Sequence, residues 1–192
     1  MRLARIAGAA IAVLALLGSI AWAGSVGLKI SGPGAVNDST IKAGEKVSVD
    51  IYISSDTMFT GFSLGFKVLS PTIKNIIHVA DSGKGLNKGG DVKGYNGWQD
   101  RSVWDMGLWP VERSWDGVLP DTLAFGGVSI KNRFNPQPPT KVLSFEMIVP
   151  ETGQLKVDSS FFPPGGRWLF SAQPGPQVEP KWLGPYTFNV VK

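Results

Sequence analysis

The stretch KVSVDIYISS, Lys46–Ser55, decides the fold. Its apolar side chains alternate with polar ones, and the apolar positions are Val47, Val49, Ile51 and Ile53. Successive side chains of a strand point to opposite faces, so a period of two predicts a strand with one face on a core. Neither glycine nor proline interrupts the run, which favours one continuous strand.

The same period recurs outward from this stretch, first in GFSLGFKVL, Gly61–Leu69. Further strands are predicted at Val26–Ser31, Ile73–Val79, Thr122–Ile130, Lys141–Val149, Gln154–Asp158, Arg167–Ser171 and Tyr186–Val191. The 24 glycines and 14 prolines in 192 residues favour many turns. No convincing helix follows any strand, which argues against a parallel α/β fold. The pattern predicts an all-β chain, an antiparallel β-sandwich of about nine strands in jelly-roll form.

The chain begins MRLARIAGAAIAVLALLGSIAWAG, which has the three parts of a secretory signal peptide. Arg2 and Arg5 precede an uncharged apolar run, and Ala21-Trp22-Ala23 is a small-x-small cleavage signal. We expect residues 1–23 to be removed and residues 24–192 to form a single secreted domain, periplasmic or extracellular. The alternative is an uncleaved membrane anchor, but the apolar run is short for a span of roughly 20 residues. After cleavage we expect no membrane span.

Charge and cysteine content narrow the function classes. The net charge is +4, and removal of Arg2 and Arg5 takes two positive charges away, leaving +2. No cluster of Lys and Arg resembles a nucleic-acid footprint, so no nucleic-acid partner is predicted. Cysteine is absent. That excludes thiol catalysis, cysteine-based zinc sites and iron–sulfur clusters.

One segment breaks the rhythm of strands. The Asp81–Asp121 segment runs about 40 residues with little strand pattern. It begins glycine-rich and continues as NGWQDRSVWDMGLWPVERSWDG, Asn96–Gly117, with four tryptophans. Connections of this length inside a compact domain are uncommon and are often functional.

Three interpretations of these tryptophans stay open. They are a platform for sugar rings, the internal core of a long connection, or an anchor for a protein partner. For a ligand site we select the four tryptophans and the polar or aromatic residues near them: Tyr95, Trp98, Gln99, Asp100, Arg101, Trp104, Trp109 and Trp115. Trp168 and Trp182 lie beside predicted strands, and we expect them in the core or at its rim.

Catalytic and metal motifs are weak. Gly61–Gly65 matches G-x-S-x-G, but its Ser63 lies inside an alternating strand, and no helix follows to form a nucleophile elbow. His78 is the only histidine, and no acidic residue lies between Ser63 and His78. We expect Ser63 to be an outward strand residue and His78 to end a strand with an ordinary hydrogen bond.

Carboxylates of the tryptophan-rich stretch could form a glycosidase pair, but a solvated loop is the favoured interpretation: Asp100, Asp105, Glu112 and Asp116. Asp81, Asn87 and Asp91 could bind calcium, but their spacing matches no EF-hand. We therefore predict no enzyme, no cofactor and no metal.

Two stretches carry a family resemblance. IKAGEKVSVDIYISSDTMFTGFSLGFKVLSP, Ile41–Pro71, resembles the opening of a cohesin-like domain: a glycine-containing turn, an alternating strand, a break with glycine and an F-x-L-x-F strand. VLSFEMIVPETGQLKVDSSFFPPGG, Val142–Gly166, resembles the later part, and YTFNVVK, Tyr186–Lys192, its closing strand. The resemblance is to cohesin-like and carbohydrate-binding-module-like sandwiches of secreted bacterial proteins, and it covers most of the chain after residue 23.

The resemblance implies a non-catalytic, nine-stranded jelly roll. Cohesins bind dockerin modules through one sheet face, and relatives bind polysaccharide. The Asp81–Asp121 segment departs from the cohesin pattern, so no binding residue of the family transfers to this chain. We expect a secreted binding module for polysaccharide or a surface protein. The alternative is a structural or adhesive subunit of a cell-surface assembly, in which the tryptophans form an internal or subunit-interface core.

Overall fold

The computed structural model describes residues 24–79, 97–99, 108–114, 116–128, 137–160, 166, 168–171, 175 and 177–192, with the main chain alone for 97–99, 108–114 and 137. The predicted signal peptide lies outside these residues. All regular structure in the described part of the chain is β-strand. No helix there has the length and apolarity to cross a membrane.

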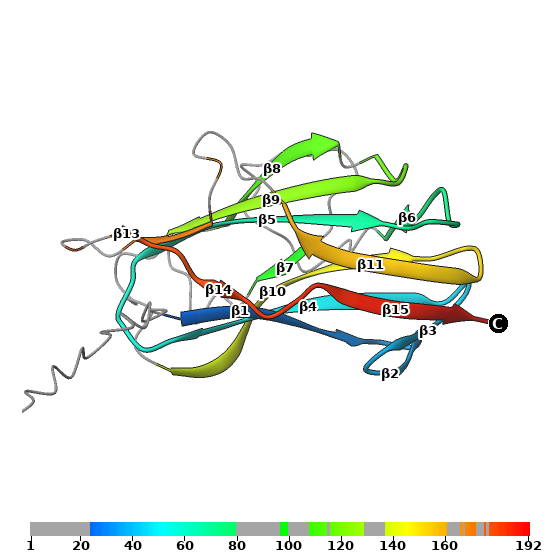
Figure 1. Cartoon of the computed structure of the whole chain (residues 1–192), viewed down its shortest axis with the longest axis horizontal. Helices are drawn as coiled ribbons and strands as arrows, with labels where there is room; N and C mark the ends of the chain where they lie inside the picture. Colours follow the sequence, from blue (N-terminus) through cyan, green and yellow to red (C-terminus); the bar gives the residue numbers. More distant parts are fainter. Residues whose placement is uncertain are drawn as a thin grey trace, which may run out of the picture.

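The first layer, sheet A, is built around the strand that the sequence marks most clearly. That strand, β4 (Lys46–Ser55), pairs antiparallel with a neighbour on each side (Figure 1). The order is β14-β1-β4-β10-β6, with β7 also on β10. The other bounds are β1 Gly24–Ser31, β6 Ile77–His78, β7 Gly97–Gln99, β10 Gln137–Ile148 and β14 Lys181–Trp182.

The second layer, sheet B, is built around β5 (Gly61–Leu69). One edge of β5 pairs with β9, which carries β8, and the other edge pairs with β12 and then β11. From β11 the sheet continues through β15, β3 and β2. The bounds are β2 Ala35–Asn37, β3 Thr40–Lys42, β8 Leu108–Ser114, β9 Asp121–Val128, β11 Gly153–Ser159, β12 Leu169–Ser171, β13 Gln177–Val178 and β15 Tyr186–Val191.

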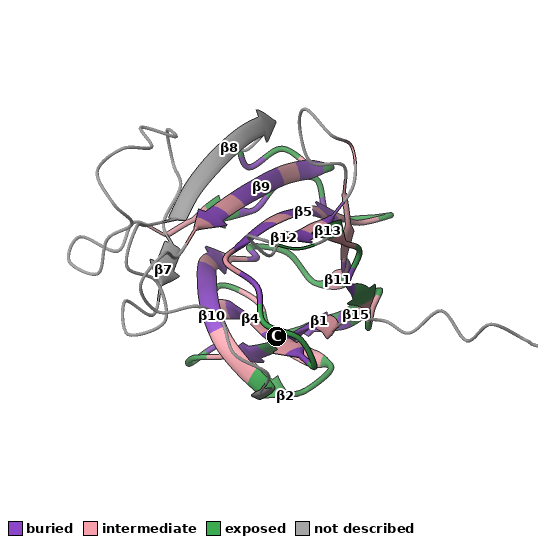
Figure 2. Ribbon diagram, turned by 90° about the vertical axis from the view of Figure 1, so that its left-hand side faces the viewer, coloured by how far each residue is buried: buried purple, intermediate pink, exposed green. Residues whose placement is uncertain are grey.

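The core fills the space between the two sheets. Figure 2 shows the layers end on, with buried strands of sheet A facing buried strands of sheet B. The alternating apolar residues of β4 and β5 are buried, as the period of two predicts. Phe66 contacts Phe125 and Trp168, at ring-centroid distances of 6.3 and 5.2 Å. The predicted β-sandwich is therefore confirmed.

Aromatic rings close the sandwich where the chain changes sheets. After β14 in sheet A, three residues lead to β15 in sheet B. Trp182 lies 5.2 Å from Trp168 and 5.4 Å from Tyr186, centroid to centroid, and its Nε1 donates to Asp158 Oδ1 at 3.2 Å. Residue 184 is glycine because a Cβ there would lie 2.4 Å from the Trp182 ring. The core and core-rim placement predicted for Trp168 and Trp182 is confirmed.

Some local predictions are wrong. The predicted strand Ile73–Val79 is reduced to β6, although Ile73 and Ile76 are buried in the core. The Asp81–Asp121 segment, expected to hold little strand, contains β7 and β8. Strand β8 reads LWPVERS, and its proline and charged residues obscure the alternation of apolar and polar side chains. An edge strand pairs on one side only, so it tolerates a proline that a central strand would not. Two short pairs, β1 with β14 and β15 with β3, are parallel.

Candidate functional site

The structure sets two of the predicted tryptophans into different sheets. Trp98 belongs to β7, in register with Ser144 of sheet A, and Gln99 is in register with Leu143. Trp109 belongs to β8, in register with Gly126 of sheet B. The other selected residues lie outside the described part of the chain: Tyr95, Asp100, Arg101, Trp104 and Trp115. A shared platform of four tryptophans therefore stays a prediction.

The chain just before the Asp81–Asp121 segment lies beside the end of that segment, and we call this junction of residues 74–76 with residues 117–119 the neck. Asn75 and Val118 form an isolated antiparallel bridge there. The Ile76 amide donates to the Gly117 carbonyl, and the Leu119 amide donates to the Lys74 carbonyl, each at 2.8 Å. A segment that leaves sheet A after β6 thus returns beside its point of departure before it enters β9.

A buried polar pair locks this neck. His78 Nε2 donates to Asp121 Oδ2 at 2.9 Å, and both side chains are buried. The Asp121 carboxylate also accepts the amides of Asp116 at 3.1 Å and Gly117 at 2.9 Å. Position 117 has φ of +88°, and a Cβ there would lie 2.6 Å from the Ile76 carbonyl oxygen, so the close approach requires glycine. The expected hydrogen bond of His78 is confirmed.

The serine motif does not join this pair. Ser63 is in register with Gly126, whereas Asp121 is in register with Val68. Ser63 and Val68 are five positions apart along β5, which is about 16 Å of strand. Val68 faces the core and Ser63, at the opposite parity, faces outward. The serine therefore cannot be the nucleophile of a triad with His78 and Asp121 in this arrangement, and its predicted outward orientation is confirmed.

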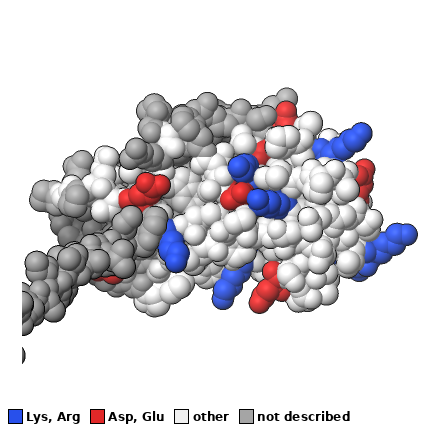
Figure 3. Space-filling model, in the orientation of Figure 1, with Lys and Arg blue, Asp and Glu red and all other residues white. Residues whose placement is uncertain are grey.

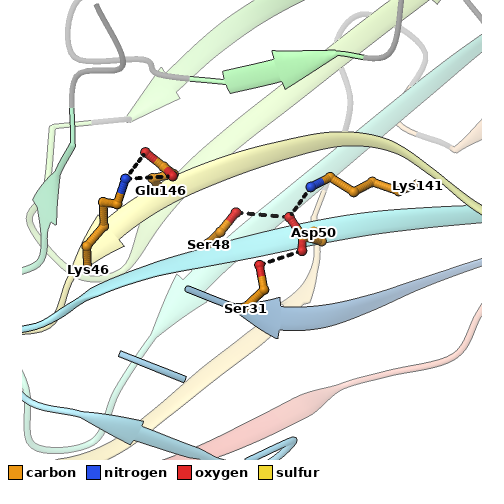
Figure 4. Close-up of polar contacts among 6 residues, drawn as sticks. All are labelled: Ser31, Lys46, Ser48, Asp50, Lys141 and Glu146. Atoms are coloured by element: carbon orange, nitrogen blue, oxygen red, sulfur yellow. Dashed lines mark hydrogen bonds and ion pairs between the residues drawn. The ribbon is translucent and has the colours of Figure 1, made fainter. Parts of the chain in front are cut away.

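The outer face of sheet A carries a satisfied polar network, drawn in Figure 4. Asp50 is buried there, where it accepts hydrogen bonds from Ser31 Oγ at 2.7 Å and Ser48 Oγ at 2.9 Å. Lys141 Nζ lies 2.9 Å from its Oδ1. Burial alone would raise the pKa of Asp50, but the hydrogen bonds from Ser31, Lys141 and Ser48 and the charge of Lys141 hold it below its ordinary value.

The outer face of sheet B is lined with small residues at its centre. Between β5 and β9, Ser63 stands beside Gly126, Gly65 beside Ala124, and Lys67 beside Thr122. The two middle residues are buried, with Ala124 1% exposed. The rim formed by Ser63, Lys67, Thr122 and Gly126 is partly exposed. The centre of this strip is therefore shielded from solvent, and its partly exposed rim is the part that another polypeptide can reach.

Neither a charged patch on the face drawn in Figure 3 nor a group of metal ligands marks a candidate site among the described residues. On the face shown in Figure 3, basic and acidic side chains are interspersed. Among the described residues no three His, Asp or Glu side chains gather in a group that could hold a metal ion. The calcium hypothesis at Asp81, Asn87 and Asp91 falls outside those residues.

Sequence reasoning missed two of these features. The polar network around Asp50 unites residues of three strands, and its only local signal is a carboxylate in the middle of an alternating strand. The small-residue strip of sheet B has a clearer signal. The small residues of Gly-x-Ser-x-Gly in β5 and of Ala-x-Gly in β9 occupy alternate positions, on the face of each strand that points away from the core. That signal needs the pairing of β5 with β9, which neither strand contains by itself.

Comparison with known proteins finds similarity in structure alone. No protein-family model matches the sequence, and a search of curated proteins finds no match. A type II cohesin domain from the cellulosome of Acetivibrio cellulolyticus is similar with a TM-score of 0.59 at 16% identity, over 86% of this chain and 95% of the cohesin.

Two further cohesins are similar over nearly their whole length. The sixth cohesin of scaffoldin B from Acetivibrio cellulolyticus, solved in complex with the Cel5 dockerin, has a TM-score of 0.54 at 10% identity, over 87% of this chain and 99% of that one. The cohesin module of a family 33 glycoside hydrolase from Clostridium perfringens has a TM-score of 0.51 at 10% identity, over 88% and 97%. The chain therefore has a cohesin-like β-sandwich fold.

Proposed function

We propose that this chain is a secreted, non-catalytic binding module whose ligand is a protein, and that the partner docks on the outer face of sheet B. The small-residue strip Ser63, Gly65, Ala124 and Gly126 carries the proposal. Gly65 and Ala124 are buried at its centre, and the partly exposed Ser63 and Gly126 present no long side chain to an approaching main chain or helix. Strand β8, contributed by the Asp81–Asp121 segment, widens this face beside β9.

The outer face of sheet A is a poorer candidate for the main partner. Its central carboxylate, Asp50, already has its hydrogen bonds filled by Ser31, Ser48 and Lys141. Lys46 and Glu146 likewise pair with each other at 3.1 Å. A partner would have to separate these pairs and desolvate the charges, which costs free energy that new contacts must first offset.

The fold comparison supports a protein ligand. Similar cohesins were solved as complexes with dockerins, among them one from Acetivibrio cellulolyticus and one from Clostridium thermocellum. The hypothesis of a polysaccharide ligand depends on the four tryptophans acting together, and two of them, Trp98 and Trp109, belong to different sheets. The alternative role as a structural subunit is favoured by a different observation: β7 and β8 add an edge strand to each sheet, as a structural use of the segment would require.

A photo-crosslinking pair tests the proposal. A benzophenone amino acid replaces Lys67 on the outer face of sheet B or, as a matched control, Lys46 on the outer face of sheet A. Both variants are secreted by the source organism and irradiated. We expect a protein adduct from position 67 that position 46 does not give, and binding of that purified protein that Lys67→Glu weakens about tenfold or more while Lys46→Glu does not.

Two outcomes would overturn the proposal. One is equal binding of the purified adduct protein by wild type and Lys67→Glu. The other is absence of any protein adduct together with depletion of the mature chain by insoluble cellulose, xylan or chitin, which would make it a carbohydrate-binding module. The Cel5 dockerin serves as the first purified candidate in the same binding assay.

A further inference from the structure

The edge of β1 that faces away from β4 carries main-chain groups with a fixed direction. The Leu183 amide donates to the Val26 carbonyl at 3.0 Å, so Val26 points its main chain away from β4. A strand directs the N–H and C=O of one residue to the same side and those of the next residue to the other side. Leu28 and Ile30 therefore point to this outer edge, and Gly27 and Lys29 point to β4.

Only the beginning of this edge is occupied. Strand β14 pairs with Ser25 and Val26, and the chain then crosses to sheet B (Figure 1). Among the residues that the structure describes, no main-chain hydrogen bond reaches Leu28 or Ile30 from this side. Both residues are buried, with exposed fractions of 5% at Leu28 and 8% at Ile30. Two N–H and two C=O groups on this edge thus have no strand partner among the described residues.

Two lysines give the edge its charge. Lys29 and Lys181 are both exposed, and Lys181 is in register with Ser25, four residues before Lys29 on the same face. Lys29 stands opposite Asp50, but that carboxylate is held by Lys141. The contact made by the Lys29 ammonium is with the Tyr52 ring, whose centroid is 5.4 Å away. The positive charge beside the edge is therefore not neutralised by an ion pair with any described residue.

A second copy of the chain is a poor occupant. Antiparallel pairing of β1 with itself around its open part would set Lys29 opposite Lys29, and like charges facing each other across strands are destabilising. Lysine on an edge strand is a common guard against such self-association. An extended segment with a carboxylate opposite Lys29 meets no such repulsion.

We propose that the β1 edge from Leu28 to Ile30 accepts an extended, acidic segment of a partner polypeptide as an added strand of sheet A, running in line with β14. Main-chain hydrogen bonds to Leu28 and Ile30 hold the added strand, and Lys29 and Lys181 select for acidic side chains. This edge lies in the opposite sheet from the small-residue strip, so the two interactions are independent.

Hydrogen exchange read by NMR tests the open edge. In mature residues 24–192 the amides of Leu28 and Ile30 exchange at least about tenfold faster than those of Gly27 and Lys29, because only the latter two donate to β4. Addition of an extended five-residue peptide of alternating threonine and valine with a central glutamate protects Leu28 and Ile30. The same peptide with a central lysine protects them far less.

A matched pair of charge reversals separates this edge from sheet B. Lys29→Glu reverses the preference to the lysine peptide, whereas Lys67→Glu leaves binding of the glutamate peptide unchanged. Equal protection of all four amides in the free protein would show that the edge is already paired and would overturn the proposal. So would open amides that neither peptide protects, or equal protection by both peptides.

Discussion

Asp50 occupies an outward position on β4 and is nevertheless buried. Side chains from three strands converge on it: Ser31 from β1, Ser48 from β4 and Lys141 from β10. A hydrogen bond to a charged group contributes about 1.5–3 kcal/mol net, so this set offsets the cost of burial and keeps the carboxylate ionised. The network also ties the central strand of sheet A to both of its neighbours.

Asp50→Asn is expected to lower the free energy of unfolding by about 1–3 kcal/mol at pH 7. The folded-state pKa of Asp50 lies below its ordinary value of 3.8, because the hydrogen bonds outweigh burial. The contribution of Asp50 to the free energy of unfolding is therefore complete above pH 3.8 and is lost as the pH falls through the lower folded-state pKa. Urea unfolding of wild type and variant across this range measures the difference.

The two unfolding curves should converge on acidification. Asp158, whose pKa is raised by burial but lowered further by Lys156, the Ser159 amide and Trp182, retains its own acid dependence in the variant. A difference between wild type and Asp50→Asn that stays constant down to the lowest pH would mean that the charge of Asp50 contributes nothing.

At the scale of elements, the neck between β6 and β9 depends on one carboxylate with three donors. Asp121 accepts from His78 and from the amides of Asp116 and Gly117. Removing the acceptor leaves all three donors without this partner, whereas removing the imidazole leaves the carboxylate with two amides. Removal of the Asp121 carboxylate should therefore destabilise the fold more than removal of the His78 imidazole.

Asp121→Ala should therefore destabilise the chain by about 3–5 kcal/mol, and His78→Ala by about 1–3 kcal/mol. Chemical denaturation gives both values, and the Gly117 amide resonance reports whether the neck keeps its hydrogen bonds in the His78 variant. A larger loss for His78→Ala than for Asp121→Ala would reverse this ranking and make the imidazole the principal support.

The sequence predicts those elements whose pattern is local. The strands at Lys46–Ser55 and Gly61–Leu69 have the predicted bounds because an alternating run with one buried face contains its own signal. The neck could not be predicted, because His78 and Asp121 are 43 residues apart and nothing in either stretch specifies the other. Strand β7 is three residues long, too short to show a period.

At the scale of the whole molecule, the sandwich is closed differently on its two sides. On one side the C-terminal segment passes from β14 in sheet A to β15 in sheet B, packed by Trp182 and Tyr186. On the other side the Asp81–Asp121 segment adds β7 to sheet A and β8 to sheet B. Both additions cover strand edges, and exposed edges promote pairing with other chains.

Replacing residues 82–115 with a six-residue Gly/Ser linker tests whether this cover is the segment's structural role. The neck is already closed by the 2.8 Å hydrogen bond from Ile76 to Gly117, so a short linker can span the gap. Loop closure itself changes the free energy little, since each doubling of loop length costs only about 0.6 kcal/mol. We expect a folded sandwich with an earlier thermal midpoint that self-associates through the bared edges of β9 and β10.

Light scattering coupled to size exclusion distinguishes the outcomes, with circular dichroism reporting the fold. A variant that stays monomeric and melts with the wild type would mean that β7 and β8 protect nothing, which would return all four tryptophans to a role in ligand binding. Loss of the folded state would instead make the segment part of the main core. Self-association of a folded variant would assign the segment to edge protection, and partner binding is then measured on the part of the sheet B face that β5 and β9 retain.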